Sequence, residues 1–589
     1  RTPPLLFRVG CDGTIETLAG TGAFGFDGDG GPALQAKLGW ALGCGFDESG
    51  NIQLVANDRL RRVGKPLPQF GFGDIAIASA DGQRVYQFDA GGRHRRTVSA
   101  LTGVVLYEFH YDTAGQLTCI DDQQGNLVVV QRNAAGKPEA ILAPFGQRTT
   151  LELDGNNNLV AVTDPTGASI RMDSTDDGLL RSFTDRSDRT SSYRYDLWGR
   201  LERTEDTAEG SNDVTRTDEL NAYTVTLTSA EGASRVHRVA KLASGQTQLL
   251  NSLGCCGGTN EALLGNDGAQ TVRFADQTTD RHVPGPDPRF GMQSPWPKER
   301  TLTFPSSLTH RTTVQASVAL SDPADYFSLT SLTLAGHVNG RSWSADYDAI
   351  DRAWTTRSPA GRETVVRLDQ RGRVAEVRHP GREPITVHYG SRGQVERMAD
   401  GPHLTRFGYD PVTGFLAAKT NALQHVTVYR RDALGWATNV VLADESTWTF
   451  ERDPHGRLLA LTEPGEAYRH QFAWTSGHRL ESYRSPLGAL ETFTYDRDRR
   501  LTNHVLATGA QIARRYNTRN QLVELRLPEG THTFQHDDQS SHLVRARSAD
   551  GQQIDYTYDG ALLTQATWSG LAQGALNYQY NDDLLVRRL

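Results

Sequence analysis

Three kinds of side chain in this sequence have the chemistry to form a site: paired carboxylates, neighbouring histidines and adjacent cysteines. General acid–base catalysis needs carboxylates whose pKa values are pushed apart by burial. The carboxylate pairs, however, fall in expected turns, and the histidine pairs have no third ligand nearby in the sequence. These groups are Asp121-Asp122, Asp176-Asp177, Asp537-Asp538, His379 with His388, and His532 with His536. We predict no catalytic residues among them.

A glycine-rich stretch near the N-terminus, Asp27-Gly28-Asp29-Gly30-Gly31, is similar to the start of a calcium loop. An EF-hand needs a glutamate at its twelfth position, and Leu38 stands there instead. A glycine-rich turn is the favoured interpretation. No HExxH, P-loop or GxSxG motif occurs in the chain. We therefore predict no metal site and no cofactor.

The cysteines are too few for a disulfide framework, since five occur in 589 residues. Two of them, Cys255 and Cys256, are adjacent in the segment LGCCGGT. No second CxxC or Cys/His cluster completes a metal tetrahedron. Ordinary buried or loop thiols are expected, and the sequence leaves open whether Cys255 and Cys256 are bonded.

Composition narrows the class of protein. The chain is several times longer than the ~100–200 residues of one domain, and its 37% hydrophobic content is below the roughly 45–50% that is usual. A net charge of −8, with arginines spread evenly, argues against nucleic acid as a partner. Apolar runs such as 127–130 are too short to cross a bilayer. The chain starts RTPPLLF, without a signal peptide, so we expect a processed protein or a piece of a longer one.

The elements that would carry any site recur with a period of about 21 residues. Aligned on the second residue of a Tyr-Asp-like pair, successive units are 20 to 22 residues apart over twelve registers. These registers are Asp348, Asp369, Gly390, Asp410, Asp432, Asp453, Thr475, Asp496, Asn517, Asp537, Asp559 and Asn581. A weaker series runs from Asp89 to Asp218, and the period fails between 218 and 348. Such a period predicts a repeat architecture.

Each unit reads as a strand, a turn, a strand and a turn. In residues 107–130, apolar and polar side chains alternate on both sides of Asp112-Thr113-Ala114-Gly115. Asp initiates such turns and Gly accepts the left-handed conformation that closes a hairpin. About 19 hairpins contain about 38 strands, and at ~4.8 Å per strand these form a ribbon roughly 180 Å long. An open sheet of this size curls, so an all-β hollow shell is predicted. A parallel β-helix and a propeller rank below it.

Four segments are predicted from these patterns. Residues 1–65 form an N-terminal remnant, 66–218 the first part of the shell, and 346–589 the second part. Residues 219–345, which hold the cysteine pair and the proline-rich tract 283–297, are expected to be an irregular insertion.

The units YDTAGQL, YDLWGRL, RDPHGRL and YDRDRRL resemble the YD repeats of the RHS/YD-repeat family over most of residues 86–589. This resemblance implies a spiralling β-hairpin shell. The family includes bacterial polymorphic toxins, the cocoon-forming components of insecticidal toxin complexes, and the teneurins. Residues 15–63 are similar to one blade of an NHL propeller, which cannot bury its own faces alone.

The resemblance also points to Asp-Pro steps, because toxin-bearing members cut themselves in such a context. They occur here as Asp164-Pro165, Asp410-Pro411 and Asp453-Pro454, each at a repeat turn, where Pro after Asp is ordinary turn chemistry. The segment YNDDLLVRRL at the end of the sequence lies inside a YD unit. Self-cleavage at these steps is not expected.

Three functions follow as hypotheses. The first is the shell of a secreted or cell-surface bacterial protein that encloses a C-terminal toxin or its own polypeptide. The second is a teneurin-like adhesion scaffold that binds a surface protein or glycan. The third, an enzyme such as a polysaccharide lyase, needs buried convergent Asp, Arg and Lys in a groove. We predict that the protein is not an enzyme.

Overall fold

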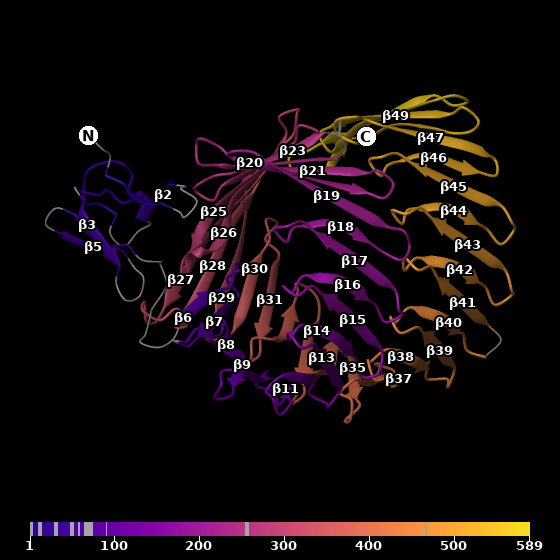
Figure 1. The fold of residues 1–589 in the computed structure, drawn as a ribbon, viewed down its shortest axis with the longest axis horizontal. Helices are drawn as coiled ribbons and strands as arrows, with labels where there is room; N and C mark the ends of the chain where they lie inside the picture. Colours follow the sequence, from indigo (N-terminus) through magenta and orange to yellow (C-terminus); the bar gives the residue numbers. More distant parts are fainter. Residues whose placement is uncertain are drawn as a thin grey trace.

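The computed structural model describes residues 4–9, 15–28, 33–39, 41–46, 52–56, 59–63, 75–89, 91–253, 258–465 and 468–588. Within these residues the fold is almost entirely β-structure (Figure 1). A single-turn 3-10 helix, η1 (Ala33–Gln35), is the exception among them. The described residues contain no helix with the length and apolar character that crossing a bilayer requires.

The N-terminal strands form a small unit of their own, at the left in Figure 1. It consists of the hairpin β1 (Leu6–Val9) and β2 (Ile15–Ala19) and of a sheet of β3 (Ala41–Phe46), β4 (Ile52–Ala56) and β5 (Arg59–Val63). Its buried core is Ala19, Leu38 and Leu54. The similarity of this part to an NHL blade remains a prediction.

The rest of the described chain forms one antiparallel sheet, from β6 to β51, in which each strand pairs with the next along the chain. The first strands are β6 (Ile75–Ala78), β7 (Arg84–Phe88), β8 (His94–Ser99), β9 (Val105–Tyr111), β10 (Leu117–Asp121), β11 (Leu127–Arg132), β12 (Pro138–Leu142), β13 (Arg148–Leu153), β14 (Leu159–Thr163), β15 (Ser169–Ser174), β16 (Leu180–Thr184), β17 (Thr190–Tyr195) and β18 (Leu201–Glu205). Antiparallel pairing of sequential strands excludes a parallel β-helix for this part of the chain.

The next strands of the same sheet are mostly longer. They are β19 (Ser211–Asp218), β20 (Ala222–Ser229), β21 (Ser234–Lys241), β22 (Thr247–Leu253), β23 (Thr259–Leu264), β24 (Gln270–Arg273), β25 (Thr279–Asp287), β26 (Gly291–Thr303), β27 (Thr309–Leu320), β28 (Leu329–Val338) and β29 (Arg341–Asp348). The expectation of an irregular insertion at 219–345 is therefore wrong. The period fails because the hairpins lengthen, β26 reaching 13 residues, and the prolines are placed where the β25–β26 register shifts.

Regular strands then complete the sheet. They are β30 (Ala353–Arg357), β31 (Glu363–Leu368), β32 (Val374–Arg378), β33 (Ile385–Tyr389), β34 (Val395–Asp400), β35 (His403–Tyr409), β36 (Leu416–Thr420), β37 (Val426–Arg431), β38 (Ala437–Val441), β39 (Thr447–Arg452), β40 (Leu458–Thr462), β41 (Arg469–Trp474), β42 (Leu480–Arg484), β43 (Leu490–Tyr495), β44 (Leu501–Val505), β45 (Gln511–Tyr516), β46 (Leu522–Leu527), β47 (Gly530–His536), β48 (Leu543–Arg547), β49 (Gln553–Asp559), β50 (Leu562–Ser569) and β51 (Gly574–Asn577). A last hairpin pairs β52 (Gln579–Tyr580) with β53 (Val586–Arg588).

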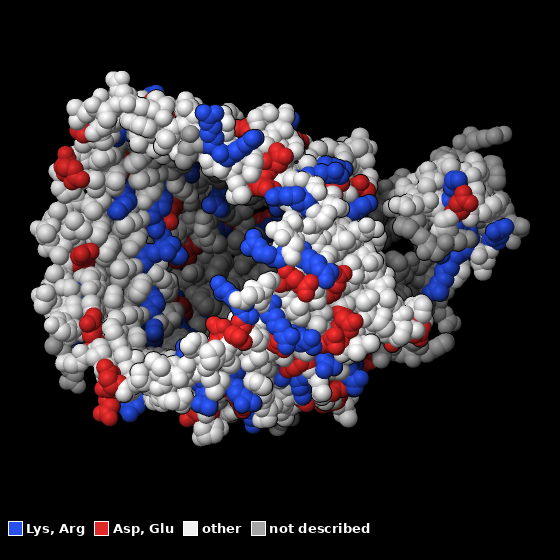
Figure 2. Space-filling model, turned by 180° about the vertical axis from the view of Figure 1, so that it is seen from behind, with Lys and Arg blue, Asp and Glu red and all other residues white. Residues whose placement is uncertain are grey.

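The ribbon winds into a hollow object, as predicted. The solvent-accessible surface is 34361 Å², whereas a compact protein of 64.7 kDa exposes only about 20,000 Å². Figure 2 shows a deep hollow in the middle of the molecule, with basic and some acidic side chains along its walls. Most strand residues are half-buried, as expected for a single layer of sheet with solvent on both faces.

Loops about 266 residues apart along this one sheet contact each other. We therefore call β6–β29 the first coil of the ribbon and β30–β51 the second. The start of the first coil is joined to its long strands, because Ala78 N–H donates to Gln293 Oε1 at 3.2 Å and Ser294 Oγ donates to the Ser79 carbonyl at 2.5 Å. An apolar cluster of Leu329, Leu332 and Tyr347 lies among these long strands. A second cluster, of Ala78, Val85, Ala100 and Phe290, lies where the start of the first coil meets these strands.

Candidate functional site: the seam between the two coils

The turn of a YD unit is built around its aspartate. Asp453 Oδ1 accepts the backbone N–H groups of His455 and Arg457 at 2.9 and 3.0 Å, and its Oδ2 accepts Arg457 Nε at 2.6 Å. Gly456 closes the loop with φ of +83°. Burial acts to raise the pKa of Asp453, but the hydrogen bonds and charge of Arg457 outweigh it and hold that pKa below its ordinary value.

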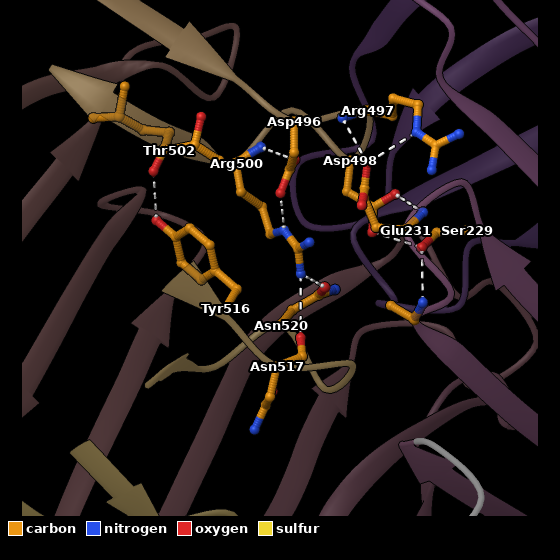
Figure 3. A network of polar contacts seen from close by, with 12 residues as sticks. Ser229, Glu231, Asp496, Arg497, Asp498, Arg500, Thr502, Tyr516, Asn517 and Asn520 are labelled. Atoms are coloured by element: carbon orange, nitrogen blue, oxygen red, sulfur yellow. Dashed lines mark hydrogen bonds and ion pairs between the residues drawn. The ribbon is translucent and has the colours of Figure 1, made fainter. Parts of the chain in front are cut away.

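The aromatic residue before the aspartate connects neighbouring units. Tyr516 Oη donates a hydrogen bond of 3.1 Å to the carbonyl of Leu501, the first residue of the preceding strand (Figure 3). The same bond joins Tyr111 to His94, Tyr195 to Leu180, Tyr389 to Val374, Tyr409 to Val395 and Tyr558 to Leu543. Where tyrosine is absent, Trp474, Arg431 and His536 bond to the equivalent carbonyl. In these units a polar side-chain atom therefore bonds back to the start of the preceding strand.

The seam is the line along which hairpin loops of the first coil meet hairpin loops of the second. Asn126 Nδ2 donates to the Arg392 carbonyl at 3.0 Å, and Gln147 Nε2 donates to the Thr413 carbonyl at 2.8 Å. In each case the two residues are 266 positions apart. The first-coil loops follow even-numbered strands and the second-coil loops follow odd-numbered strands, so opposite edges of the ribbon meet.

Ion pairs and hydrogen bonds strengthen the seam near its middle (Figure 3). Ser229 Oγ donates to Asp498 Oδ2 at 2.5 Å, and Glu231 N–H donates to Asp498 Oδ1 at 3.2 Å. Arg497 Nε in turn donates to Glu231 Oε1 at 2.9 Å, and this hydrogen bond lowers the pKa of Glu231. Here the seam is polar, with charged groups from both coils.

Another part of the seam is apolar. A pocket of about 620 Å³ lies between the loops of the two coils, with Phe145 from the first and Phe415 from the second among its lining residues. The Arg392 guanidinium lies 4.6 Å from the centre of the Phe145 ring. The two coils are thus held together by several different kinds of contact.

Two histidines and one aspartate meet across the seam; we call Asp185, His455 and His478 the imidazole cluster. Asp185 comes from the loop after β16, whereas the histidines come from the loops after β39 and β41. Their Nε2 atoms lie 3.1 and 3.0 Å from Asp185 Oδ2, and the two rings are 4.9 Å apart between centroids. Within the described ranges it is the one group of three ligand-bearing side chains close enough to hold a metal ion.

The surroundings of this cluster favour a proton over a metal. Arg457 Nη1 lies 2.8 Å and Arg189 Nη1 3.3 Å from His478 Nδ1. A guanidinium only donates, so Nδ1 is an acceptor and the proton of the neutral ring is on Nε2. An imidazole that binds a metal through Nε2 carries its proton on Nδ1, where these guanidinium groups would oppose it. Burial, then the charges of Arg457 and Arg189, lower the pKa of His478.

The carboxylates singled out from the sequence are engaged in turns. Asp164 Oδ1 accepts the Thr166 and Ala168 N–H groups, and Asp410 Oδ1 accepts those of Val412 and Thr413. Turn contacts likewise occupy Asp121, Asp122, Asp177 and Asp537, and Asp538 pairs with Arg519. Asp176 lies in the same turn as Asp177.

The other candidates fall into two groups. His379 bonds to Thr364 and His536 to the Leu522 carbonyl, contacts within the sheet. Asp27 pairs with Lys37 at 2.8 Å. Asp29, Gly30, Gly31, Cys11, Cys255 and Cys256 lie outside the described residues, while Cys44 and Cys119 are free thiols.

Sequence reasoning did not find the imidazole cluster, because its members are far apart in the chain. His455 and His478 belong to neighbouring YD turns, and Asp185 lies 270 residues before His455. The signal that would have found them is the seam offset of about 266 residues, which brings loop 185–189 beside loops 453–457 and 475–479.

A hollow wall of antiparallel hairpins, in which Tyr-Asp turns connect each hairpin to its neighbour, defines the class of YD-repeat shells. The family model for the teneurin YD-shell matches residues 73–588, and this chain belongs to that family. Human teneurin-4 is 24% identical over 578 residues, covering 95% of this chain and 20% of that protein. Zebrafish (Danio rerio) teneurin-3 is 25% identical over 557 residues, covering 91% and 20%. The chain spans about a fifth of the length of these relatives.

Similar solved structures include a Photorhabdus luminescens Tc holotoxin pore and the TcdB2-TccC3-TEV complex. The first has a TM-score of 0.39 at 13% identity, covering 86% of this chain and 33% of that chain. The second has a TM-score of 0.40 at 13% identity, covering 90% and 32%.

Proposed function

We propose that this chain is the wall of a container that encloses polypeptide, either a C-terminal toxin or a further part of its own chain. The observation that supports this proposal is the hollow inside the wall. An exposed surface of 34361 Å² is about 1.7 times that of a compact protein of this mass, and charged side chains line the opening in Figure 2. Walls of this kind suit a solvated or incompletely folded chain, whereas a packed apolar core would leave no room for one.

The proposal extends to partner and compartment. The enclosed polypeptide is the first partner, and the container is secreted or displayed on a bacterial cell surface. No step of catalysis is assigned to the wall, because the carboxylates and histidines described above are used in turns and in the seam. Its mechanism is physical: the seam keeps the two coils together, and the enclosed chain is separated from its surroundings until the coils part.

Native protein of natural length tests the container. Limited proteolysis would be run on the intact protein and on a variant whose seam is weakened at Asp498, with intact-mass measurement of what co-elutes on size exclusion. We expect an enclosed segment to be protected in the native protein and cleaved in the variant. Equal cleavage of that segment in both would contradict enclosure.

A second function, adhesion, is favoured by exposed apolar side chains at a loop on the edge of the first coil. Leu197 is 98% and Trp198 77% exposed there. Exposed aromatic side chains bind proteins and glycans well, and the curated relatives described above are teneurins. In this scaffold model the partner is a cell-surface protein or glycan and nothing need be released.

The adhesion model is tested by binding of the intact protein to cells. Trp198→Ser is expected to reduce binding at least tenfold if this loop contacts the partner. Leu487→Ser is the matched control, since Leu487 is 90% exposed at a loop that follows β42 on the other edge of the ribbon. Equal binding by wild type and both variants would contradict this model.

A further inference from the structure

The imidazole cluster joins the coils through a ring whose two nitrogen atoms face groups of opposite charge. His478 Nε2 lies 3.0 Å from Asp185 Oδ2, while Nδ1 accepts from Arg457 at 2.8 Å and is 3.3 Å from Arg189. Asp185 and Arg189 belong to the first coil and the other two residues to the second. Through Nδ1 the neutral ring therefore accepts hydrogen bonds from both coils, from Arg189 of the first and Arg457 of the second.

We propose that the imidazole of His478 is an acid-sensitive fastening of the seam, whose protonation loosens loop 185–189 of the first coil from loops 453–457 and 475–479 of the second. A protonated ring would place a second N–H against Arg457 and Arg189, which have no lone pair to accept it. The contact that His478 makes with both guanidinium groups would then become a repulsion.

Other contacts of Arg457 and Arg189 limit how far these residues can move away from a protonated His478 ring. Arg457 is held in place by Asp453, which accepts both its Nε and, at 2.5 Å, its Nη2. Arg189 is fixed through its backbone N–H, which donates to Asp185 Oδ1 at 3.1 Å. The Arg457 guanidinium therefore cannot leave the ring without breaking its contacts with Asp453, and the main chain of Arg189 is held beside the ring.

Other charged groups of both signs surround the ring. From the first coil these are Asp185 itself, only 8% exposed, and Arg186, which pairs with Asp164 at 3.2 Å. From the second coil they are His455 and, beyond Gly477, Arg499, which pairs with Asp206. Asp185 attracts a protonated His478, whereas burial, the guanidinium groups of Arg457 and Arg189 and a charged His455 oppose it.

The sign of the effect follows from this balance. Burial, then Arg457 and Arg189, lower the pKa of His478 in the closed seam below the ordinary value of about 6.5. The contribution of His478 to the closed seam is thus present above pH 6.5 and is lost as the pH falls below that value, because the open form takes up the proton. One proton changes the opening equilibrium by at most about tenfold per pH unit.

Hydrogen–deuterium exchange on the full chain at pH 7.5 and 5.5, corrected for intrinsic rates, tests the proposal. Protection of amides in loops 185–189 and 475–479 is expected to fall several-fold at pH 5.5. The control is the seam contact between Gln147 and Thr413, which has no titratable side chain and is expected to keep its protection. Equal protection of loops 185–189 and 475–479 at both pH values would overturn the proposal.

Two variants separate this effect from general acid sensitivity. His478→Gln keeps a polar side chain but cannot be protonated, so the acid effect on these loops should disappear. Arg189→Gln leaves the ring in place and removes one opposing charge, so the effect should shrink.

Exchange at the imidazole C2–H of wild-type His478 gives its pKa directly, and a value at or above 6.5 would also overturn the idea. Because none of these readouts requires an enclosed chain, failure here leaves the container proposal standing.

Discussion

The guanidinium of Arg373 lies 4.0 Å from the centre of the Tyr389 ring, and so joins one YD turn to the next. Arg373 is itself bound to Asp369 of its own turn at 2.8 Å, and Tyr389 bonds back to the Val374 carbonyl. The same Asp, Arg and aromatic contacts recur at Asp453, Arg457 and Trp474 and at Asp496, Arg500 and Tyr516. The motif serves to connect neighbouring hairpins as well as to form each turn.

Removing a tyrosine hydroxyl should weaken this edge. Tyr558→Phe is expected to lower the free energy of unfolding by about 1 kcal/mol, the usual contribution of one such hydrogen bond, because Tyr558 Oη bonds to the part-buried Leu543 carbonyl at 2.9 Å. Tyr389→Phe is the comparison, since its bond to Val374 is exposed and water can replace it. Urea denaturation checks both variants, and an equal loss in the two would contradict this account.

Two turn glycines with the same backbone conformation should respond differently to alanine. Gly456 and Gly509 have φ of +83° and +84°. A Cβ at Gly456 would lie 2.6 Å from the Trp436 ring, whereas one at Gly509 would meet nothing within 4 Å. We expect Gly509→Ala to cost about 1 kcal/mol from backbone strain. Gly456→Ala should cost a further 1–3 kcal/mol, roughly, from overpacking. Equal melting temperatures of the two variants would count against this reading.

The turn aspartates should make stability fall in acid. The Asp453 carboxyl has its pKa held below the ordinary Asp value of about 3.9. Its contribution is present above that value and is lost as the pH drops through 3.9 and below the folded-state pKa. Asp453→Asn is expected to flatten the dependence of the urea midpoint on pH between pH 3 and 5. Arg457→Gln should do the same, and an unchanged slope in both would refute the prediction.

Loss of a seam contact should open the seam without unfolding the hairpins that bear it. Asp498→Ala removes the acceptor of Ser229 Oγ and of Glu231 N–H. Hydrogen exchange should increase in loops 229–233 and 496–500 and stay unchanged within β19 and β20. Asp538→Ala is a control at an 84% exposed carboxylate in the second coil. Faster exchange throughout both strands would mean that the loop contact supports the sheet itself.

The periodic part of the fold is predictable from sequence because its determinants are local. An aspartate that caps its own turn, as Asp196 does with the Trp198 and Arg200 N–H groups, leaves a signal within five residues. The same local reasoning was wrong at 219–345. There the strands are longer, as in β27 with 12 residues, so a fixed spacing could not reveal that the hairpins continue.

The loops that meet at the seam could not be predicted from the sequence, for a geometric reason. Which loop meets which depends on how many hairpins complete one coil, and this follows from the accumulated twist and curvature of the whole ribbon. No residue near Asn126 indicates that Arg392 will be its partner. The imidazole cluster was missed on the same ground, since Asp185 has an ordinary turn sequence around it.

The offset along the seam also sets an order of events during synthesis. When Asn126 leaves the ribosome, its partner Arg392 is 266 residues from being made, a delay of roughly 15–50 s at about 5–20 residues per second. The first coil must therefore persist as an open crescent, with one edge waiting for contacts. Each later hairpin can then dock as it emerges, so the wall closes progressively from its oldest loop to its newest.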